Sequence, residues 1–187
     1  SVHEAARRYF HSPKLIRMIL IFVYLFGALS LSFLCSVLEA VLLSTPLSYI
    51  SMLEERGVKS AGLLKRYKKD IDRPISAILS LNTIAHTVGA AGVGAEAVKV
   101  FGQEYFGIIS AILTVLILVL SEIIPKIVGA TYWRSLAIAA ARVVRVLIFI
   151  TYPLVVLSDL IMHAVARRNK DQASVSREEV SAMVNVG

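Results

Sequence analysis

Four long stretches without a charged residue are the candidates for membrane-spanning helices in this sequence. They cover residues 18–38, 74–95, 105–121 and 146–158. A helix needs about 20 apolar residues to cross a bilayer, with a lower limit of about 17. The first three stretches meet this limit, the third continuing as apolar sequence beyond Glu122, and the fourth does not. The pattern therefore predicts three membrane-spanning helices, over about 18–43, 75–98 and 106–129.

The region of the fourth stretch, about 133–165, has a different pattern. Arg134, Arg142 and Arg145 recur among aliphatic residues in its first half. Arg142 and Arg145 are three residues apart and therefore share one face of a helix. This arrangement favours an amphipathic juxtamembrane helix in the interface, bent at Pro153, over a fourth full span.

The connection between the first two spans, residues 45–73, is basic and predicts two short helical pieces broken at Gly57 and Gly62. Its basic residues are Arg56, Lys59, Lys65, Arg66, Lys68, Lys69 and Arg73. The connection over 96–104 has only Lys99. The excess of Lys and Arg in cytoplasmic loops predicts that the first connection is cytoplasmic and the second is outside.

With three spans, this orientation gives an outside N-terminus and a cytoplasmic C-terminus, in the plasma (cell inner) membrane. The basic residues of the N-terminal flank, 1–17, argue for the opposite orientation. They are Arg7, Arg8, Lys14 and Arg17.

Composition supports an all-α integral membrane domain in contact with lipid. Hydrophobic residues make up 57% of the chain and charged residues 18%, against about a quarter in a soluble domain. The net charge of +7 does not indicate nucleic-acid binding, because the basic residues flank apolar runs and form no nucleic-acid motif. Cys35 is the single cysteine, which excludes an internal disulfide and a cysteine-based metal site. No hydrolase or metalloprotease motif is present, so we do not expect an enzyme.

Polar residues inside the spans are costly in lipid and are therefore functional candidates. In the first span, Ser32, Ser36 and Glu39 follow the spacing i, i+4, i+7 and share one face. The alternative is a stripe of hydroxyls bonded to their own helix, with Glu39 at the headgroups.

The second span has two polar lines. One consists of Ser76, Ser80, Thr83 and Thr87, and the other of Asn82 and His86. The small residues over 89–95 predict close helix packing. Packing does not explain Asn82, whose amide needs partners in hydrocarbon. We expect His86 to be a packing residue more than a ligand.

The third span ends in Ser121-Glu122-Ile-Ile-Pro125-Lys126. Pro125 has no amide hydrogen, so the Ser121 carbonyl loses its helical partner and lies free beside the Glu122 carboxylate. The competing interpretation is an ion pair between Glu122 and Lys126 at i, i+4.

Together the spans offer one oxygen donor each, from Ser36, Asn82 and Glu122, with Ser80 and the Ser121 carbonyl as supplements. Secondary candidates are Ser32, Glu39, Thr83 and His86. Hydroxyls, an amide and one carboxylate suit Mg²⁺, which demands oxygen ligands. Na⁺ can use the same oxygens, so the pattern alone does not select the ion.

Three strings resemble the transmembrane domain of the CorC/cyclin M family of magnesium transport proteins, over about residue 18 to the C-terminus. They are Ser36-Val-Leu-Glu39-Ala40, Ser80-Leu-Asn82-Thr83 and Ser121-Glu122-Ile-Ile-Pro125-Lys126. The resemblance implies three spans, a cytoplasmic helical pair and a juxtamembrane helix. Relatives often have Gly-Asn-Asn or Gly-Asn-Thr where this chain has Leu81-Asn82-Thr83, so one amide is missing.

The resemblance also implies a function and partners. It implies a homodimer that exports Mg²⁺, coupled to Na⁺ entry, with a dehydrated ion held by Ser36, Asn82, Glu122 and Ser80. The alternative is a membrane domain that senses Mg²⁺ or binds a partner without transport. Residues 169–187 resemble the start of a linker to a nucleotide-binding CBS module, so nucleotide binding is not expected in this chain itself.

Overall fold

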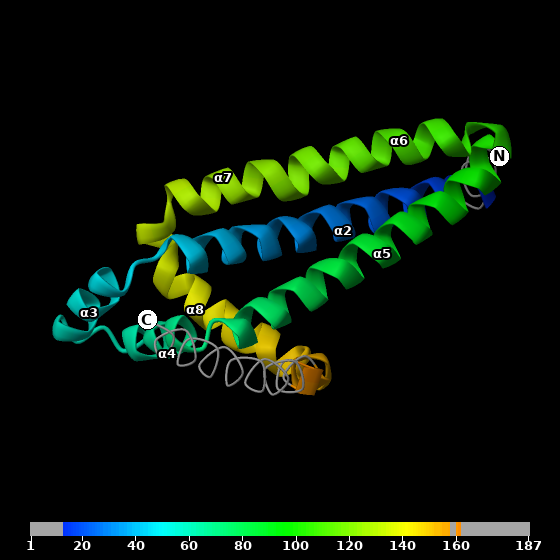
Figure 1. Ribbon diagram of the computed structural model, residues 1–187. Helices are drawn as coiled ribbons and strands as arrows, with labels where there is room; N and C mark the ends of the chain where they lie inside the picture. The colour runs from blue at the N-terminus through cyan, green and yellow to red at the C-terminus, as the bar shows by residue number, and fades with distance from the viewer. Residues whose placement is uncertain (1–12, 158–159, 162–187) are drawn as a thin grey trace, which may run out of the picture.

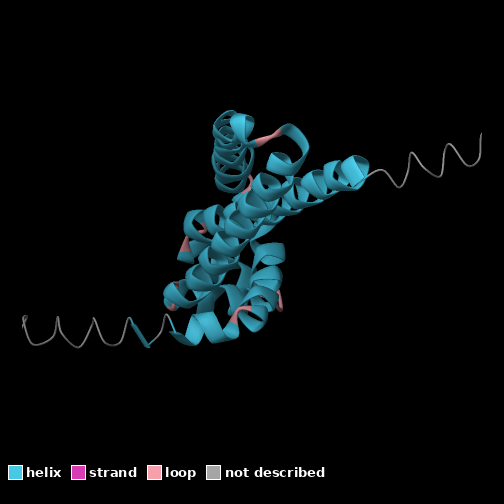
Figure 2. Cartoon of the chain, turned by 90° about the vertical axis from the view of Figure 1, so that its right-hand side faces the viewer, coloured by secondary structure: helices cyan, strands magenta, loops and turns pink. Residues whose placement is uncertain are grey.

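The computed structural model describes residues 13–157 and 160–161, and within these it contains helices and short connections but no strand (Figures 1 and 2). Three of its helical segments are long and apolar enough to span a membrane, which confirms the three predicted spans. The first is α2, Pro13–Ser44, and the second is α5, Asp72–Phe101. The third runs through η1 (Gln103–Tyr105), α6 (Phe106–Leu116), the π-helical turn η2 (Ile117–Ile123) and α7 (Ile124–Thr131).

Each span is longer than its predicted apolar segment. α2 has 32 residues, which corresponds to a length of about 48 Å, against a hydrocarbon core of about 30 Å. The hydrogen-bonded helix begins before the charge-free stretch and includes Lys14 and Arg17. The ends of the helices therefore lie outside the charge-free stretches from which the spans were predicted.

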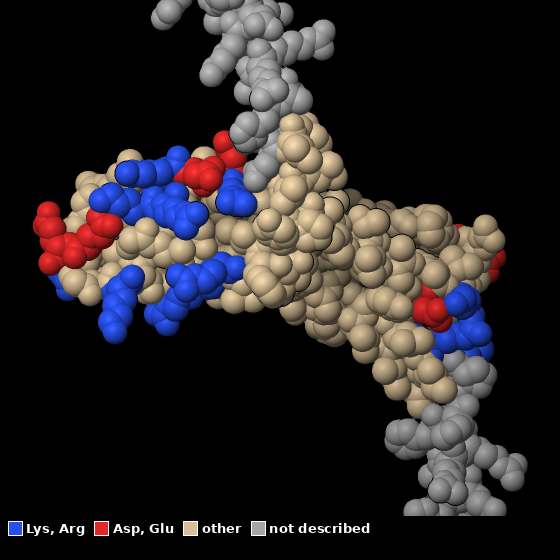
Figure 3. Space-filling model, turned by 90° about the horizontal axis from the view of Figure 1, so that it is seen from below, with Lys and Arg blue, Asp and Glu red and all other residues tan. Residues whose placement is uncertain are grey.

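The outward surface of the spans is made of large apolar side chains. Phe26, Ile108 and Val115 are each about 60% exposed, at 62%, 61% and 59%. Figure 3 shows this uncharged surface as a broad zone between two charged ends. Such a zone is unfavourable in water and is satisfied by lipid.

Small residues bring α5 close to α2, which lies between α5 and α7 (Figure 1). A Cβ placed on Gly89 would lie 2.2 Å from the Ala28 Cβ, and one on Gly92 would lie 2.5 Å from the Tyr24 ring. These glycines therefore allow the close helix packing that the sequence predicts.

Two short helices, α3 (Leu47–Glu55) and α4 (Ala61–Lys69), form the predicted pair between the first two spans. The break falls at Gly57, whose φ is +73°, whereas Gly62 lies inside α4. Lys65 and Glu54 form an ion pair between the two helices.

The pair is fixed beneath the end of α2 by Lys68. Its Nζ donates to the carbonyls of Leu42 and Leu43, at 2.7 and 3.0 Å. A cation at this end of a helix complements the helix dipole. Burial lowers the pKa of Lys68 from its ordinary value.

α8, Trp133–Ile150, crosses the same end of the bundle and contacts α2, α4 and α5 (Figure 1). It is amphipathic as predicted: Ala137, Ala141 and Val144 are fully buried, whereas Arg142 and Arg145 are exposed. It is not among the segments that qualify as spans in the described part of the chain.

The predicted bend at Pro153 is instead a break two residues earlier, at Thr151. α8 ends where the backbone of Thr151 leaves the helical conformation, at φ −94° and ψ 14°, and a new helical segment covers 152–157. The Thr151 N–H and hydroxyl both still donate to the Leu147 carbonyl at 2.8 Å. Pro153 lies in the first turn of that segment, where its missing N–H has no cost. Residues 158–159 and 162–165 of the predicted juxtamembrane helix, residues 1–12 of the flank and the linker over 169–187 lie outside the described residues.

Candidate functional site

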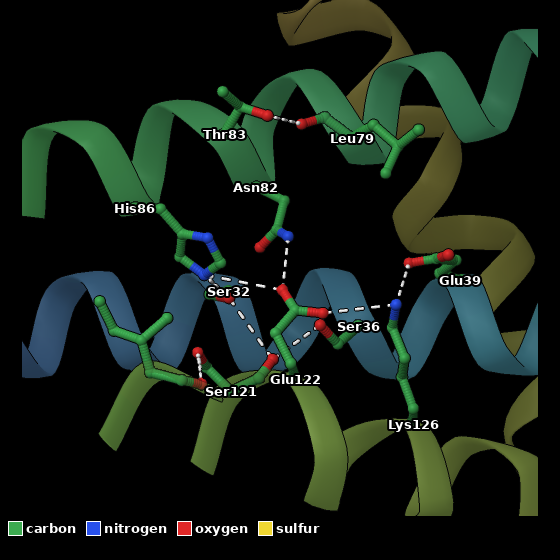
Figure 4. A network of polar contacts seen from close by, with 11 residues as sticks. Ser32, Ser36, Glu39, Leu79, Asn82, Thr83, His86, Ser121, Glu122 and Lys126 are labelled. Atoms are coloured by element: carbon green, nitrogen blue, oxygen red, sulfur yellow. Dashed lines mark hydrogen bonds and ion pairs between the residues drawn. The ribbon is translucent and has the colours of Figure 1, made fainter. Parts of the chain in front are cut away.

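The polar side chains of the three spans meet at one place in the bundle (Figure 4). Ser32 and Ser36 of α2 lie at its floor and are fully buried. Asn82 and His86 of α5 reach it from one side, and Ser121 and Glu122 of η2 reach it from the other. The three spans therefore share a single polar cluster.

The Ser121 carbonyl is bonded by side chains of another helix. Because 117–123 forms a π-helical turn, the Ile124 N–H donates to Val119, five residues back. The next residue, Pro125, has no N–H to give to Ser121. The carbonyl accepts instead from the Ser36 hydroxyl at 2.7 Å, with the Ser32 hydroxyl at 3.5 Å. The sequence predicts that this carbonyl lacks its helical partner, and in the structure it accepts hydrogen bonds from α2 instead.

The Ser121 hydroxyl takes no part in this contact. It donates to the Ile117 carbonyl at 2.7 Å, within its own helix. Ser121 thus offers the cluster a main-chain oxygen rather than a side-chain oxygen.

The Glu122 carboxylate lies at the centre of the cluster. Its Oε1 accepts from Asn82 Nδ2 at 2.9 Å and lies 3.7 Å from His86 Nε2. Its Oε2 lies 3.3 Å from Lys126 Nζ, so the competing i, i+4 ion pair is present. His86 Nε2 also lies 2.5 Å from the Ser32 hydroxyl.

Lys126 pairs with a second carboxylate that sequence reasoning did not connect to it. Its Nζ is 3.3 Å from Glu39 Oε2 as well as from Glu122. The lysine therefore bridges acidic residues of α2 and of the third span. Only the tertiary packing of α7 on α2 creates this contact, since the two residues are distant in sequence.

The close contact of α7 with α2 depends on Gly129. A Cβ at this position would lie 2.7 Å from the Val37 carbonyl oxygen and 2.8 Å from the Ala40 Cβ. Glycine thus lets the two backbones approach beside Glu39 and one turn beyond Lys126. The signal in the sequence for this contact was Gly129, a small residue one turn after Lys126.

Asn82 uses only one side of its amide. Its Nδ2 donates to Glu122, whereas its Oδ1 is buried and has no hydrogen-bond partner among the described residues. A buried acceptor without a donor costs about 1–3 kcal/mol. This oxygen is available to a ligand that accepts electron pairs.

Two predicted residues are not brought to the cluster. Thr83 is exposed, and its hydroxyl donates to the Leu79 carbonyl of its own helix, away from Glu122 in Figure 4. Ser80 is half-buried and makes no hydrogen bond to the cluster in the described part of the chain. It precedes Asn82 by two residues, which turns it by about 200° around the helix.

The chemistry of the assembled donors suits a hard cation. They are hydroxyl, amide and carbonyl oxygens together with the carboxylate of Glu122. Among the described residues, no three His, Cys, Asp or Glu side chains gather into a metal-binding group. Zn²⁺ and Cu⁺ prefer nitrogen and sulfur, whereas Mg²⁺ prefers oxygen.

Comparison with known proteins gives a family and several relatives. The family described as "Cyclin M transmembrane N-terminal domain" matches residues 20–187. A Synechocystis protein described as "UPF0053 protein sll1254" is 36% identical over 167 residues, which cover 89% of this chain and 47% of the relative. A Haemophilus influenzae "UPF0053 protein" is 29% identical over 88% of this chain and 40% of its own length. An Escherichia coli "UPF0053 inner membrane protein YfjD" is 24% identical over 71% and 32%. The chain thus spans less than half the length of these relatives.

Proposed function

The chain belongs to the cyclin M transmembrane family, and from this premise we propose that it carries Mg²⁺ across the membrane. In the proposal, a dehydrated ion binds where the three spans meet, among Ser36, Asn82, Glu122 and the Ser121 carbonyl. The protein acts as a homodimer, and export of Mg²⁺ is coupled to entry of Na⁺.

One observation carries the proposal: oxygen atoms from all three spans converge beside the Glu122 carboxylate, and the Asn82 Oδ1 has no donor. A structural polar cluster would tend to satisfy every buried acceptor. Here an unpaired oxygen points to a ligand with positive charge. The carboxylate supplies the opposite charge that such an ion needs in a medium of low dielectric constant.

Lys126 has a defined part in this proposal. Because it lies 3.3 Å from both Glu122 and Glu39, it can leave one carboxylate and keep the other. Entry of a divalent ion at Glu122 repels the ammonium group, which then pairs with Glu39 alone. The ammonium group of Lys126 thus competes with an incoming ion for Glu122.

Energetics support the coupling to Na⁺. Moving one charge across the membrane costs about 2.3 kcal/mol per 100 mV, so export of a divalent ion from a negative interior needs a driving ion. Inward Na⁺ provides one and uses the same class of oxygen ligand. The description of the Escherichia coli relative as an inner membrane protein supports the same location for this chain.

The test is Mg²⁺ flux in proteoliposomes that contain the full chain and a Mg²⁺-sensitive dye, with an imposed Na⁺ gradient. Glu122→Gln should lower the flux by about a hundredfold or more, because it removes the charged ligand and keeps the shape. The matched control is Glu96→Gln, since Glu96 is paired with Lys99 more than ten residues along α5 from Asn82 and makes no contact with the cluster among the described residues, so it should be dispensable for flux.

Two results would contradict transport at this site. One is flux in Glu122→Gln that equals the flux of the wild-type chain. The other is saturable Mg²⁺ binding without flux under any Na⁺ gradient, which would favour the sensing function instead.

A further inference from the structure

A second polar feature lies away from the cation site, at the end of the bundle where α4, the first turn of α5 and α8 meet. A cavity of about 330 Å³ opens there. Three arginines line it, Arg66 of α4, Arg73 of α5 and Arg145 of α8, together with Tyr67 and Asp70. Figure 3 shows that basic side chains gather at this end of the molecule, next to the uncharged surface of the spans.

The positive groups converge on the wall of the cavity. Tyr67 is buried, with 8% of its surface exposed. Burial raises the pKa of Tyr67, and the charges of Arg145 and then Arg66 oppose this rise, so both guanidinium groups lie near its hydroxyl. The three arginines outnumber the single lining carboxylate, Asp70. The cavity is therefore positive and open, since Arg66 and Arg145 are exposed.

Arginine geometry selects the type of anion. A guanidinium group has a planar fork of donors that matches phosphate, and several forks on different helices can hold one phosphate from several sides. The buried Tyr67 adds a hydroxyl to the same wall. These donors come from three helices that the fold already fixes, so the site does not need to be assembled.

The position of the cavity selects the source of the phosphate. Arg73 lies in the first turn of a membrane span, and Pro74, the next residue, also lines the cavity. On α8, Ile148 lines the cavity, and its neighbours Phe149 and Val146 are 83% and 54% exposed. A phosphate in the cavity is thus beside an apolar surface that can contact acyl chains. Basic pockets beside membrane helices are typical headgroup sites.

We propose that this cavity binds the phosphate of an anionic phospholipid headgroup, with the acyl chains against the exposed apolar side chains of Val146 and Phe149 on α8. The lipid then ties α4, α5 and α8 together at one membrane surface. The proposal is independent of Mg²⁺ transport, because none of its residues belongs to the cation site.

The experiment titrates the purified chain in neutral detergent with short-chain phosphatidylglycerol, short-chain phosphatidylcholine or inorganic phosphate, and follows the melting temperature and the binding curve. We expect phosphatidylglycerol to bind and to raise the melting temperature, and we expect the other two probes to have little effect. Arg66→Gln and Arg145→Gln should each weaken phosphatidylglycerol binding by about fivefold. The matched control is Arg56→Gln, because Arg56 is exposed at the end of α3 and does not line the cavity.

Arg145→Lys and Arg66→Lys keep the charge and should retain part of the affinity, which guards against a variant that fails to fold. Equal binding of phosphatidylglycerol by the wild-type chain and both Gln variants would overturn the proposal. Inorganic phosphate that competes as well as phosphatidylglycerol would also overturn it, because the cavity would then be a site for soluble anions.

Discussion

At the residue scale, each oxygen of the Glu122 carboxylate has a different partner. Oε1 accepts from Asn82, and Oε2 faces Lys126. The partner of Oε1 is a neutral amide, which does not repel an incoming cation. The partner of Oε2 is a positive charge, which an incoming cation must displace. The proposed binding of Mg²⁺ therefore implies a competition between the ion and a lysine of the same chain for Glu122.

Lys126→Met tests this competition. Removal of the ammonium group leaves Glu39 and Glu122 without their shared cation, so Mg²⁺ affinity should rise by about tenfold or more. The folded chain should be less stable without Mg²⁺ and should regain stability when Mg²⁺ is added. Both effects are measured by titration calorimetry and by thermal unfolding in detergent.

Lys99→Met is the matched control, since Lys99 pairs with Glu96 at i, i+3 and has no contact with the site. Its Mg²⁺ affinity should equal that of the wild-type chain. Weaker Mg²⁺ binding in Lys126→Met would mean that the lysine supports the site rather than competes for it.

At the element scale, an irregular turn in the third span exposes a main-chain oxygen to the polar cluster. The π-helical segment over 117–123, followed by Pro125, directs a main-chain carbonyl to the Ser36 hydroxyl of α2. Such turns are rare in proteins, and many of those that occur lie at functional sites. The irregular turn supplies the oxygen, and the regular packing of α7 beside it fixes the distance to α2.

The polar positions of the spans could be read from the sequence, because charge-free stretches and a proline are local signals. Ser36, Asn82, Glu122 and the Ser121 carbonyl follow from these signals and do meet in the structure. The contact of Lys126 with Glu39 could not be read in this way, because it depends on how α7 packs on α2.

The two polar lines of α5 show a second limit of sequence reasoning. Helical spacing identifies the residues that share a face, but it does not identify the face that turns toward the neighbouring helix. Helical spacing and the Ser80-Leu-Asn82-Thr83 string predict Ser80 and Thr83 as site residues, and neither hydroxyl bonds to the cluster among the described residues. The buried Ala85 and Gly89 mark the packed face, and Asn82 and His86 flank it. Small residues were thus the better guide to orientation.

Gly129→Ala tests the close packing of α7 on α2. The added Cβ meets the Val37 carbonyl oxygen and the Ala40 Cβ at less than 3 Å, so the helices must separate. We expect a loss of about 1–3 kcal/mol in the free energy of unfolding, and weaker Mg²⁺ binding because Glu39 and Lys126 move apart.

The control for this variant is Gly107→Ala, on α6, where an added Cβ has no atom within 4 Å. Its stability should equal that of the wild-type chain or exceed it slightly, as alanine favours a helix. Equal thermal unfolding of both variants would contradict the assigned contact.

At the scale of the whole molecule, the chain has an asymmetric distribution of charge. The basic connection that contains α3 and α4 and the crossing helix α8 gather at one end, and the connection between α5 and α6 lies at the other (Figure 1). The asymmetry favours a cytoplasmic position for the α3–α4 end. In that orientation, the proposed headgroup cavity faces the inner leaflet.

Cysteine labelling tests the orientation. Lys59→Cys and Gln103→Cys each place a thiol on an exposed position at opposite ends, and the native Cys35 is fully buried. In intact cells, a membrane-impermeant maleimide should label residue 103 and should not label residue 59. The reverse pattern would show that the basic end is outside, as the basic N-terminal flank suggests.

The central claim is that oxygens of three spans bind one cation, and isothermal titration of Mg²⁺ into three forms of the purified chain tests it most directly. The forms are the wild type, Asn82→Leu, which replaces the buried amide with a side chain of similar size, and Thr83→Val, which removes an outward hydroxyl from the next position. We predict saturable binding in the wild type and in Thr83→Val, and a loss of about tenfold or more in affinity in Asn82→Leu. Binding in Asn82→Leu that matches the wild type would contradict the claim.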